Sequence, residues 1–249
     1  DATADAVALA ETLGVPIVTP NLPAFNYLSA THPLYLGTRV GGDFERGLHR
    51  GAGKAEGAME RVDPADPLSH KPLVERESVR ILRRRGELII SETRHGFVCA
   101  NAGIDLSNVE QGWAALLPED PDRSARRIRD AIRGRTGTSV GVIVSDTFGR
   151  TWRRGVTDVA IGSAGLIPVM DLRGTQDSYG RELQVTEVAV VDEIAGAAEL
   201  VMGKSSGIPV AIVRGLGDEV FAAVGRDGVE EHRGVLTDVV RSPAEDLFR

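Results

Sequence analysis

Ser139-Val140-Gly141-Val142-Ile143-Val144-Ser145 is the stretch from which the fold can be inferred most directly. A short, continuous apolar run rich in β-branched residues is typical of a strand buried in a sheet. Residues 122–135, just before it, are strongly charged and have the composition of a helix, with Asp120 or Asp122 as the candidate N-cap. This part of the chain is therefore predicted to be a helix followed by a buried strand.

Outward from this strand, predicted helices and strands alternate along much of the chain. Helices are predicted for residues 2–13, 73–85, 122–135 and 185–202, and strands for residues 15–19, 87–92, 113–117, 139–145 and 209–213. This alternation favours the α/β class, in a mixed α+β form. Flanking helices are expected to cover a mixed sheet in which at least some strands are parallel.

The composition excludes several classes of protein. With 249 residues, 42% of them hydrophobic and 26% charged, the chain has the length and composition of a folded protein of one large or two small domains. Its net charge of −7 argues against a nucleic-acid binder. Cys99 is the only cysteine, which excludes an intrachain disulfide. No apolar run reaches the ~20 residues that span a bilayer, and no signal peptide is evident, so a cytoplasmic protein is expected.

Polar residues follow the apolar run of 139–145. Asp146 and Thr147 come directly after it, and Gly149 follows. Ligands of α/β sheets gather beyond the carboxyl ends of strands, where a carboxylate and a hydroxyl are suited to hold a metal ion. The alternative is that Asp146 only begins a turn.

Asp105 lies in a second polar segment, close to Ser107 and Asn108. Short polar side chains of this kind favour turns, so Asp105 is equally explained as a turn cap. The functional interpretation pairs Asp105 with Asp146 around Mg²⁺ or Mn²⁺, which prefer oxygen ligands. Two carboxylates ~4 Å apart repel each other by about 4 kcal/mol at an effective dielectric near 20, and a bound dication would reverse the sign.

A glycine-rich loop is predicted at Met202-Gly203-Lys204-Ser205-Ser206-Gly207-Ile208-Pro209. It is not a P-loop, because Ala198 stands where that motif needs glycine and because the loop follows a helix and precedes a strand. A cation, hydroxyls and backbone N–H groups are nevertheless suited to bind phosphate. Taken locally, the segment is better explained as a solvated connection.

Other residues permit two interpretations each. Lys54 is by default a surface lysine, and His95 is either a base or a partly solvated turn histidine. Cys99 lies in an apolar stretch and is expected to be buried rather than nucleophilic. Trp152, among Arg150, Arg153 and Arg154, either stacks on a planar ring or packs against arginine stems.

Several segments together resemble the coenzyme F420 gamma-glutamyl ligase family. Order and spacing agree across residues 52–249. The segments are 54–57, 76–80, 92–105 (which ends in Asn101-Ala102-Gly103-Ile104-Asp105), 145–149, 157–162, 186–189 and 203–215.

The resemblance implies the family's fold and a GTP-dependent ligase reaction. L-glutamate would be added in gamma linkage to coenzyme F420-0 through an acyl phosphate, with GDP and phosphate released. Asp105 and Asp146 would hold a first Mg²⁺ or Mn²⁺, and Thr147 would help hold a second. K⁺ is a further candidate ion. Lys54, Asn108 and the loop Met202, Gly203, Lys204, Ser205, Ser206, Gly207, Ile208 and Pro209 would contact GTP.

The resemblance also implies a domain organisation. Residues 52–240 are expected to form the ligase domain of a homodimer, and residues 241–249 a linker to a nitroreductase-like domain in the full-length chain. Residues 1–51 do not match and are expected to be a fused or misassembled segment. The competing hypotheses are a catalytically impaired GTP- and metal-binding remnant and, from residues 13–37 alone, a piece of a thiamine diphosphate enzyme.

Overall fold

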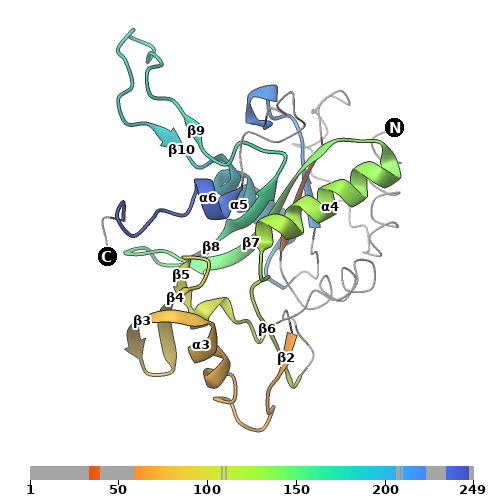
Figure 1. Ribbon diagram of the computed structural model, residues 1–249, viewed down its shortest axis with the longest axis vertical. Helices are drawn as coiled ribbons and strands as arrows, with labels where there is room; N and C mark the ends of the chain where they lie inside the picture. The colour runs from red at the N-terminus through yellow and green to blue at the C-terminus, as the bar shows by residue number, and fades with distance from the viewer. Residues whose placement is uncertain are drawn as a thin grey trace.

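The central element of the fold is a mixed sheet with the strand order β11-β1-β7-β8 (Figure 1). The computed structural model describes residues 59–107, 109, 111–205, 208, 210–222 and 234–246, together with the backbone of residues 34–39. β1 (Leu34–Arg39) runs parallel to β7 (Val140–Gly149) and antiparallel to β11 (Val210–Val213). β8 (Val156–Ala164) is antiparallel to β7. The predicted mixed α/β class, with some parallel pairing, is confirmed.

Two helices pack on this sheet, α4 (Pro121–Thr136) and α5 (Val190–Met202). Buried side chains of α4 and α5 share one apolar core with the inner residues of β7 and β8. The apolar run predicted to be a buried strand is indeed the centre of this core, since Val142 is 0% and Ile143 1% exposed. Among the described residues, no helix combines the length and the apolar character needed to cross a membrane.

Smaller elements lie around the central sheet. β3 (Ser78–Arg85), β4 (Leu88–Thr93) and β5 (Val98–Ala100) form an antiparallel sheet beside α3 (Lys71–Glu77). β2 (Met59–Arg61) pairs with β6 (Trp113–Ala115), and β9 (Met170–Asp171) with β10 (Glu187–Val188) in an arm that extends from the body in Figure 1. The short helices are η2 (Asn101–Gly103), η3 (Asp218–Val220) and α6 (Val235–Asp238).

Three predicted boundaries are wrong. The helix expected over residues 73–85 ends at Glu77, and Ser78–Arg85 is a strand because it pairs with β4. The helix expected over 185–202 begins only at Val190, since Glu187 and Val188 pair with β9. The strand expected to end before Asp146 continues to Gly149, because β8 pairs with it along its whole polar half. The predicted helix 2–13 and strand 15–19 lie outside the described residues.

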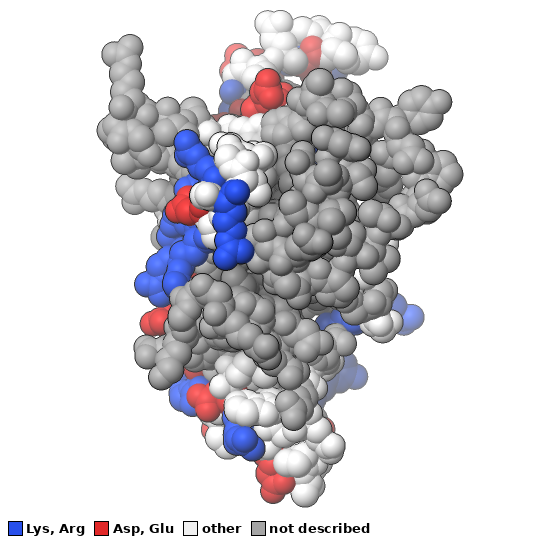
Figure 2. Space-filling model, turned by 90° about the vertical axis from the view of Figure 1, so that its right-hand side faces the viewer, with Lys and Arg blue, Asp and Glu red and all other residues white. Residues whose placement is uncertain are grey.

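The helix α4 is rich in arginine. Its arginines are Arg123, Arg126, Arg127, Arg129, Arg133 and Arg135. Figure 2 shows a strip of basic side chains on the side where α4 lies in Figure 1. Arg126 pairs with Asp120 at 3.8 Å and Arg129 with Asp130 at 3.0 Å, exposed contacts that stabilise the fold little.

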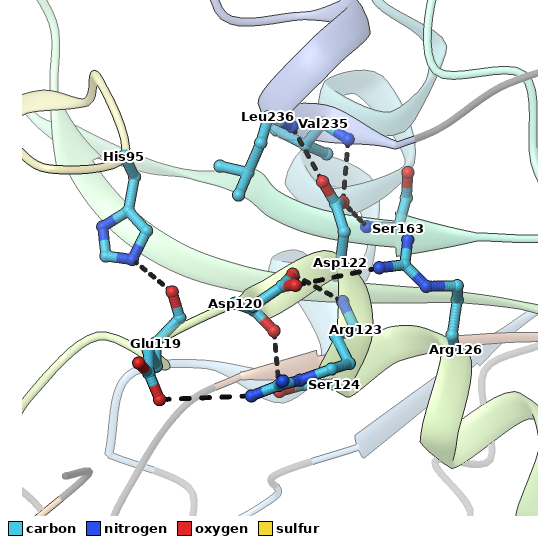
Figure 3. Close-up of polar contacts among 10 residues, drawn as sticks. All are labelled: His95, Glu119, Asp120, Asp122, Arg123, Ser124, Arg126, Ser163, Val235 and Leu236. Carbon is cyan, nitrogen blue, oxygen red and sulfur yellow. Dashed lines mark hydrogen bonds and ion pairs between the residues drawn. The ribbon is translucent and has the colours of Figure 1, made fainter.

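The start of α4 is fixed by two aspartates with different roles (Figure 3). Asp120 is the N-cap and accepts a hydrogen bond from the backbone N–H of Arg123 at 2.8 Å. Asp122 is buried, and accepts from the N–H groups of Ser163 and Val235 at 2.8 Å and of Leu236 at 2.9 Å. Of the two predicted caps, Asp120 is confirmed. Asp122 instead joins α4, β8 and α6, an arrangement we call the Asp122 junction.

Gly162 allows α4 to approach the sheet closely. A Cβ atom at this position of β8 would overlap the backbone carbonyl group of Pro121 and lie 2.7 Å from the backbone N of Asp122. Backbone atoms at a helix start cannot move aside as the end of a flexible side chain can. The absence of a side chain at residue 162 therefore sets the distance between β8 and α4.

We expect Gly162→Ala to lower the free energy of unfolding by about 3 kcal/mol, since overpacking against backbone forces the helix outward. Urea denaturation followed by circular dichroism measures the effect. Gly149→Ala, in β7, is the matched control because nothing lies within 4 Å of its added Cβ. Equal stability of the two variants would show that the contact between Gly162 and Pro121 is not limiting.

Candidate functional site

Asp105 is positioned by a left-handed turn. Asn101 has a φ of 50° and Ala102 a φ of 54°, values that non-glycine residues adopt rarely and at a cost of about 1–3 kcal/mol each. Gly103 follows with a φ of 73°, and a Cβ there would lie 2.6 Å from Leu117. The side-chain oxygen of Asn101 accepts from the Ile89 N–H at 3.1 Å, which stabilises the turn. Such strained turns are found preferentially at functional sites.

Beyond the turn, Asp105 is held by backbone and side-chain contacts. Its backbone pairs with Ala115 of β6 in both directions, at 3.0 and 2.9 Å. Its carboxylate accepts from the N–H of Ser107 at 2.7 Å and from the Ser107 hydroxyl at 2.7 and 2.8 Å. The Lys204 Nζ atom lies 3.6 Å from Asp105 Oδ2. The turn cap predicted from the sequence is therefore present, and the carboxylate also faces a cation.

Asp146 lies on β7, in surroundings that disfavour its negative charge. Burial, opposed by the Thr147 N–H that donates to its Oδ1 at 2.7 Å, raises the pKa of Asp146 to about 7. The negative charge of Asp105 raises this pKa further, the positive charge of Lys204 lowers it, and Asp158 raises it. The charges of Asp105 and Lys204 therefore both act on Asp146, and we call the two carboxylates the acidic site.

Thr147 makes a different contact. Ser145 Oγ and Thr147 Oγ1 donate to the two oxygens of buried Asp158, at 3.0 and 2.8 Å. Ser145 and Thr147 share one face of β7 because side chains alternate along a strand, so Asp146 leaves the strand on the other face. Thr147 lies next to Asp146 in sequence, but its hydroxyl is directed to Asp158. Its role in holding a second ion stays a prediction.

The loop after α5 divides into buried and exposed residues. Met202 is fully buried, and Ile208 packs on the same small cluster with Ala198 and Ala211, so both side chains anchor the loop. Gly203 has a φ of 59° and donates its N–H to the Glu199 carbonyl oxygen at 2.9 Å. Lys204 and Ser205 are exposed, and Lys204 points to the acidic site. Lys54, Asn108, Ser206, Gly207 and Pro209 lie outside the described residues.

The other candidate residues, Cys99, His95 and Trp152, lie in different surroundings. Cys99 is 6% exposed, and burial together with the charge of Asp146 raises its pKa to about 12. The prediction that Cys99 is buried is confirmed. His95 lies 3.1 Å from the Glu119 carbonyl oxygen through Nε2 (Figure 3) and stacks on Phe97, and burial lowers its pKa. Trp152, between β7 and β8, is 83% exposed.

The donor set of the acidic site fits a small, hard divalent cation. Carboxylate oxygens are ligands that Mg²⁺ and Mn²⁺ prefer, and a bound dication would offset the repulsion between Asp105 and Asp146. Within the part of the chain that is described, no three His, Cys, Asp or Glu side chains form a metal-binding group. An ion here would complete its shell with water and phosphate oxygens, as Mg²⁺ usually does.

Comparison with known proteins identifies related chains. A model of the family described as F420-0:Gamma-glutamyl ligase matches residues 51–215. The coenzyme F420:L-glutamate ligase of Methanopyrus kandleri is 44% identical over 223 residues, 84% of this chain and 86% of the relative. The protein of the same name from Methanothermobacter thermautotrophicus is 54% identical over 140 residues, 56% of each chain. That of Methanocaldococcus jannaschii is 44% identical over 174 residues, 70% of this chain and 65% of the relative.

Proposed function

The chain belongs to the F420-0:gamma-glutamyl ligase family, and we propose that it adds L-glutamate in gamma linkage to coenzyme F420-0 and its glutamylated forms, at the expense of GTP. The relatives are named as ligases of coenzyme F420 and L-glutamate. The proposal is best supported by the ion pair of Lys204 with Asp105 at 3.6 Å together with the effect of both charges on the pKa of Asp146, within the region that the family model matches.

The proposed reaction has two steps. A carboxylate oxygen of coenzyme F420-0 attacks the γ-phosphorus of GTP. The bond between this phosphorus and the β-phosphate oxygen breaks, and GDP leaves. The amine of L-glutamate then attacks the carbonyl carbon of the acyl phosphate, the carbon–oxygen bond breaks, and phosphate leaves as the amine loses its protons. Phosphoryl transfer depends mainly on positioning and on neutralising charge, so a protein nucleophile is not required.

The residues of this chain would contribute charge and position. Asp105 and Asp146 would hold Mg²⁺ or Mn²⁺, which would neutralise the phosphate oxygens during transfer. Lys204 would contact the phosphates of a nucleotide bound to such an ion, because its Nζ atom lies 3.6 Å from Asp105 Oδ2. The buried Met202 and the partly buried Ile208 would keep this loop in place rather than touch the nucleotide.

Mass spectrometry of the product tests the proposal. Purified protein is incubated with F420-0, L-glutamate, GTP and Mn²⁺, and we expect a product heavier by one glutamyl residue, with GDP and phosphate formed in equal amounts. Omitting GTP, or adding EDTA, is expected to abolish the product. Tight binding of GTP and Mn²⁺ in calorimetry without any product would instead support the impaired remnant. The homodimer, K⁺ and a further C-terminal domain stay predictions.

A further inference from the structure

Lys204 is placed so that it can act as a cation for the acidic site. Its Nζ atom lies 3.6 Å from Asp105 Oδ2, and its charge is one of those that act on Asp146. Both carboxylates of the site therefore experience the same ammonium group. A divalent ion that binds Asp105 and Asp146 must share this space with Lys204 or displace it, because like charges at one carboxylate repel.

The ion pair between Lys204 and Asp105 is exposed enough for a metal ion to replace the lysine. Half of the Lys204 side chain and about a third of the Asp105 side chain are exposed to solvent, at 50% and 36%, and ion pairs of such exposure stabilise a fold only weakly. The backbone before Lys204 is fixed, since Met202 is buried and the Gly203 N–H donates a hydrogen bond to the Glu199 carbonyl oxygen. The ammonium group can therefore leave Asp105 by rotation of its own side chain, while α5 and its last turn stay in place.

We propose that Lys204 is the resident counter-ion of the acidic site, which a divalent cation displaces from Asp105 and which then binds the phosphate that arrives with that cation. This inference rests on the proposed function, because it requires that Asp105 and Asp146 bind a metal. Lys204 thereby lowers the affinity for free metal and raises the affinity for the metal–nucleotide complex. The site is in this way selective for a metal ion that is already bound to a nucleotide, over the free metal ion.

Titration with Mn²⁺, followed by calorimetry or by the electron paramagnetic resonance signal of free Mn²⁺, tests the first half of the exchange. Without nucleotide, we expect Lys204→Met to bind Mn²⁺ roughly tenfold more tightly than the unchanged protein. Lys204→Arg keeps the positive charge and is expected to bind Mn²⁺ as the unchanged protein does. Lys71→Met is the matched control, because Lys71 is at the first turn of α3 and is not among the charges that act on Asp146.

Titration with GTP at saturating Mn²⁺ tests the second half. We expect Lys204→Met to bind GTP at least roughly tenfold more weakly, while Lys71→Met is unchanged. Equal or weaker Mn²⁺ binding by Lys204→Met would overturn the exchange and leave the metal site of the proposed function standing. Absence of Mn²⁺ binding in every variant would overturn both. Matching circular dichroism spectra establish that each variant is folded.

Discussion

Asp146→Asn is expected to lower kcat of the ligase reaction by at least ~1,000-fold, because the substitution removes one of the two carboxylates that would hold the ion opposite the phosphates. The change keeps the size of the side chain and an oxygen that can accept from the Thr147 N–H. Steady-state formation of the glutamylated product, with Mn²⁺ binding measured in parallel, gives the result. Asp130→Asn, on the exposed face of α4, is the control. A loss of less than about tenfold would count against Asp146 as a ligand.

The same variant is expected to be more stable than the parent protein when metal is absent. The pKa of Asp146 is raised from 3.8 to about 7, so the native state binds more protons than the unfolded state between these values. The stabilising contribution is fully present below pH 3.8 and is lost as pH rises through about 7. Above that range the ionised, half-buried carboxylate opposes folding, by on the order of 4 kcal/mol.

Urea denaturation in EDTA at about pH 5 and about pH 8 measures this difference. Asp146→Asn is expected to equal or exceed the parent at the higher pH and to lose the dependence on pH that Asp146 causes. Added Mn²⁺ is expected to reverse the order, since only the parent protein gains stability from binding the ion. An Asp146→Asn variant that is less stable than the parent at both pH values would contradict the raised pKa of Asp146.

The second large effect is expected at the Asp122 junction. Asp122→Ala is expected to lower the free energy of unfolding by about 4 kcal/mol, because the backbone N–H groups of Ser163, Val235 and Leu236 lose their acceptor. Two of these bonds, those to Ser163 and Val235, are fully buried. Unmade hydrogen bonds of buried groups cost more than the bonds contribute when made.

Asp120→Ala is the matched control for this experiment. It removes an exposed N-cap of the same helix, two residues away, and is expected to cost about 1 kcal/mol. Chemical denaturation of both variants gives the comparison. An equal loss would mean that Asp122 acts only as a second helix cap. A further measurement is hydrogen exchange of the Val235 and Leu236 amides, which should lose protection in Asp122→Ala but not in Asp120→Ala.

The sequence predicts best those elements whose signal is local. The apolar run of β7 and the Asp120 cap of α4 depend on neighbouring residues alone, and both are present. The segment 78–85 was wrongly predicted to be part of a helix because Val74, Val79 and Leu82 fit a helical stripe. In the structure Val79 is 68% exposed, and the segment is a strand because the next strand, β4, pairs with it, a contact that the periodicity of residues 78–85 does not reveal.

For the acidic site, too, the local sequence predicted some features and not others. Local patterns allowed Asp105 and Asp146 to be paired around a metal ion as one of two interpretations, and the resemblance favoured that pairing. The position of Asp105 depends on the left-handed turn at Asn101 and Ala102, which no spacing rule predicts. Asp122 could not have been recognised either, because its partners are 41, 113 and 114 residues away in sequence.

The burial of Cys99 next to Asp146 provides a built-in chemical reporter. The chain has one thiol, and with a pKa of about 12 and 6% exposure it stays protonated and hidden in the native state at neutral pH. Iodoacetamide would therefore modify the protein only while β5 is detached from its neighbours. The alkylation rate would report the population of this open state, and its slowing by Mn²⁺ would show that a bound ion stabilises the packing of β5.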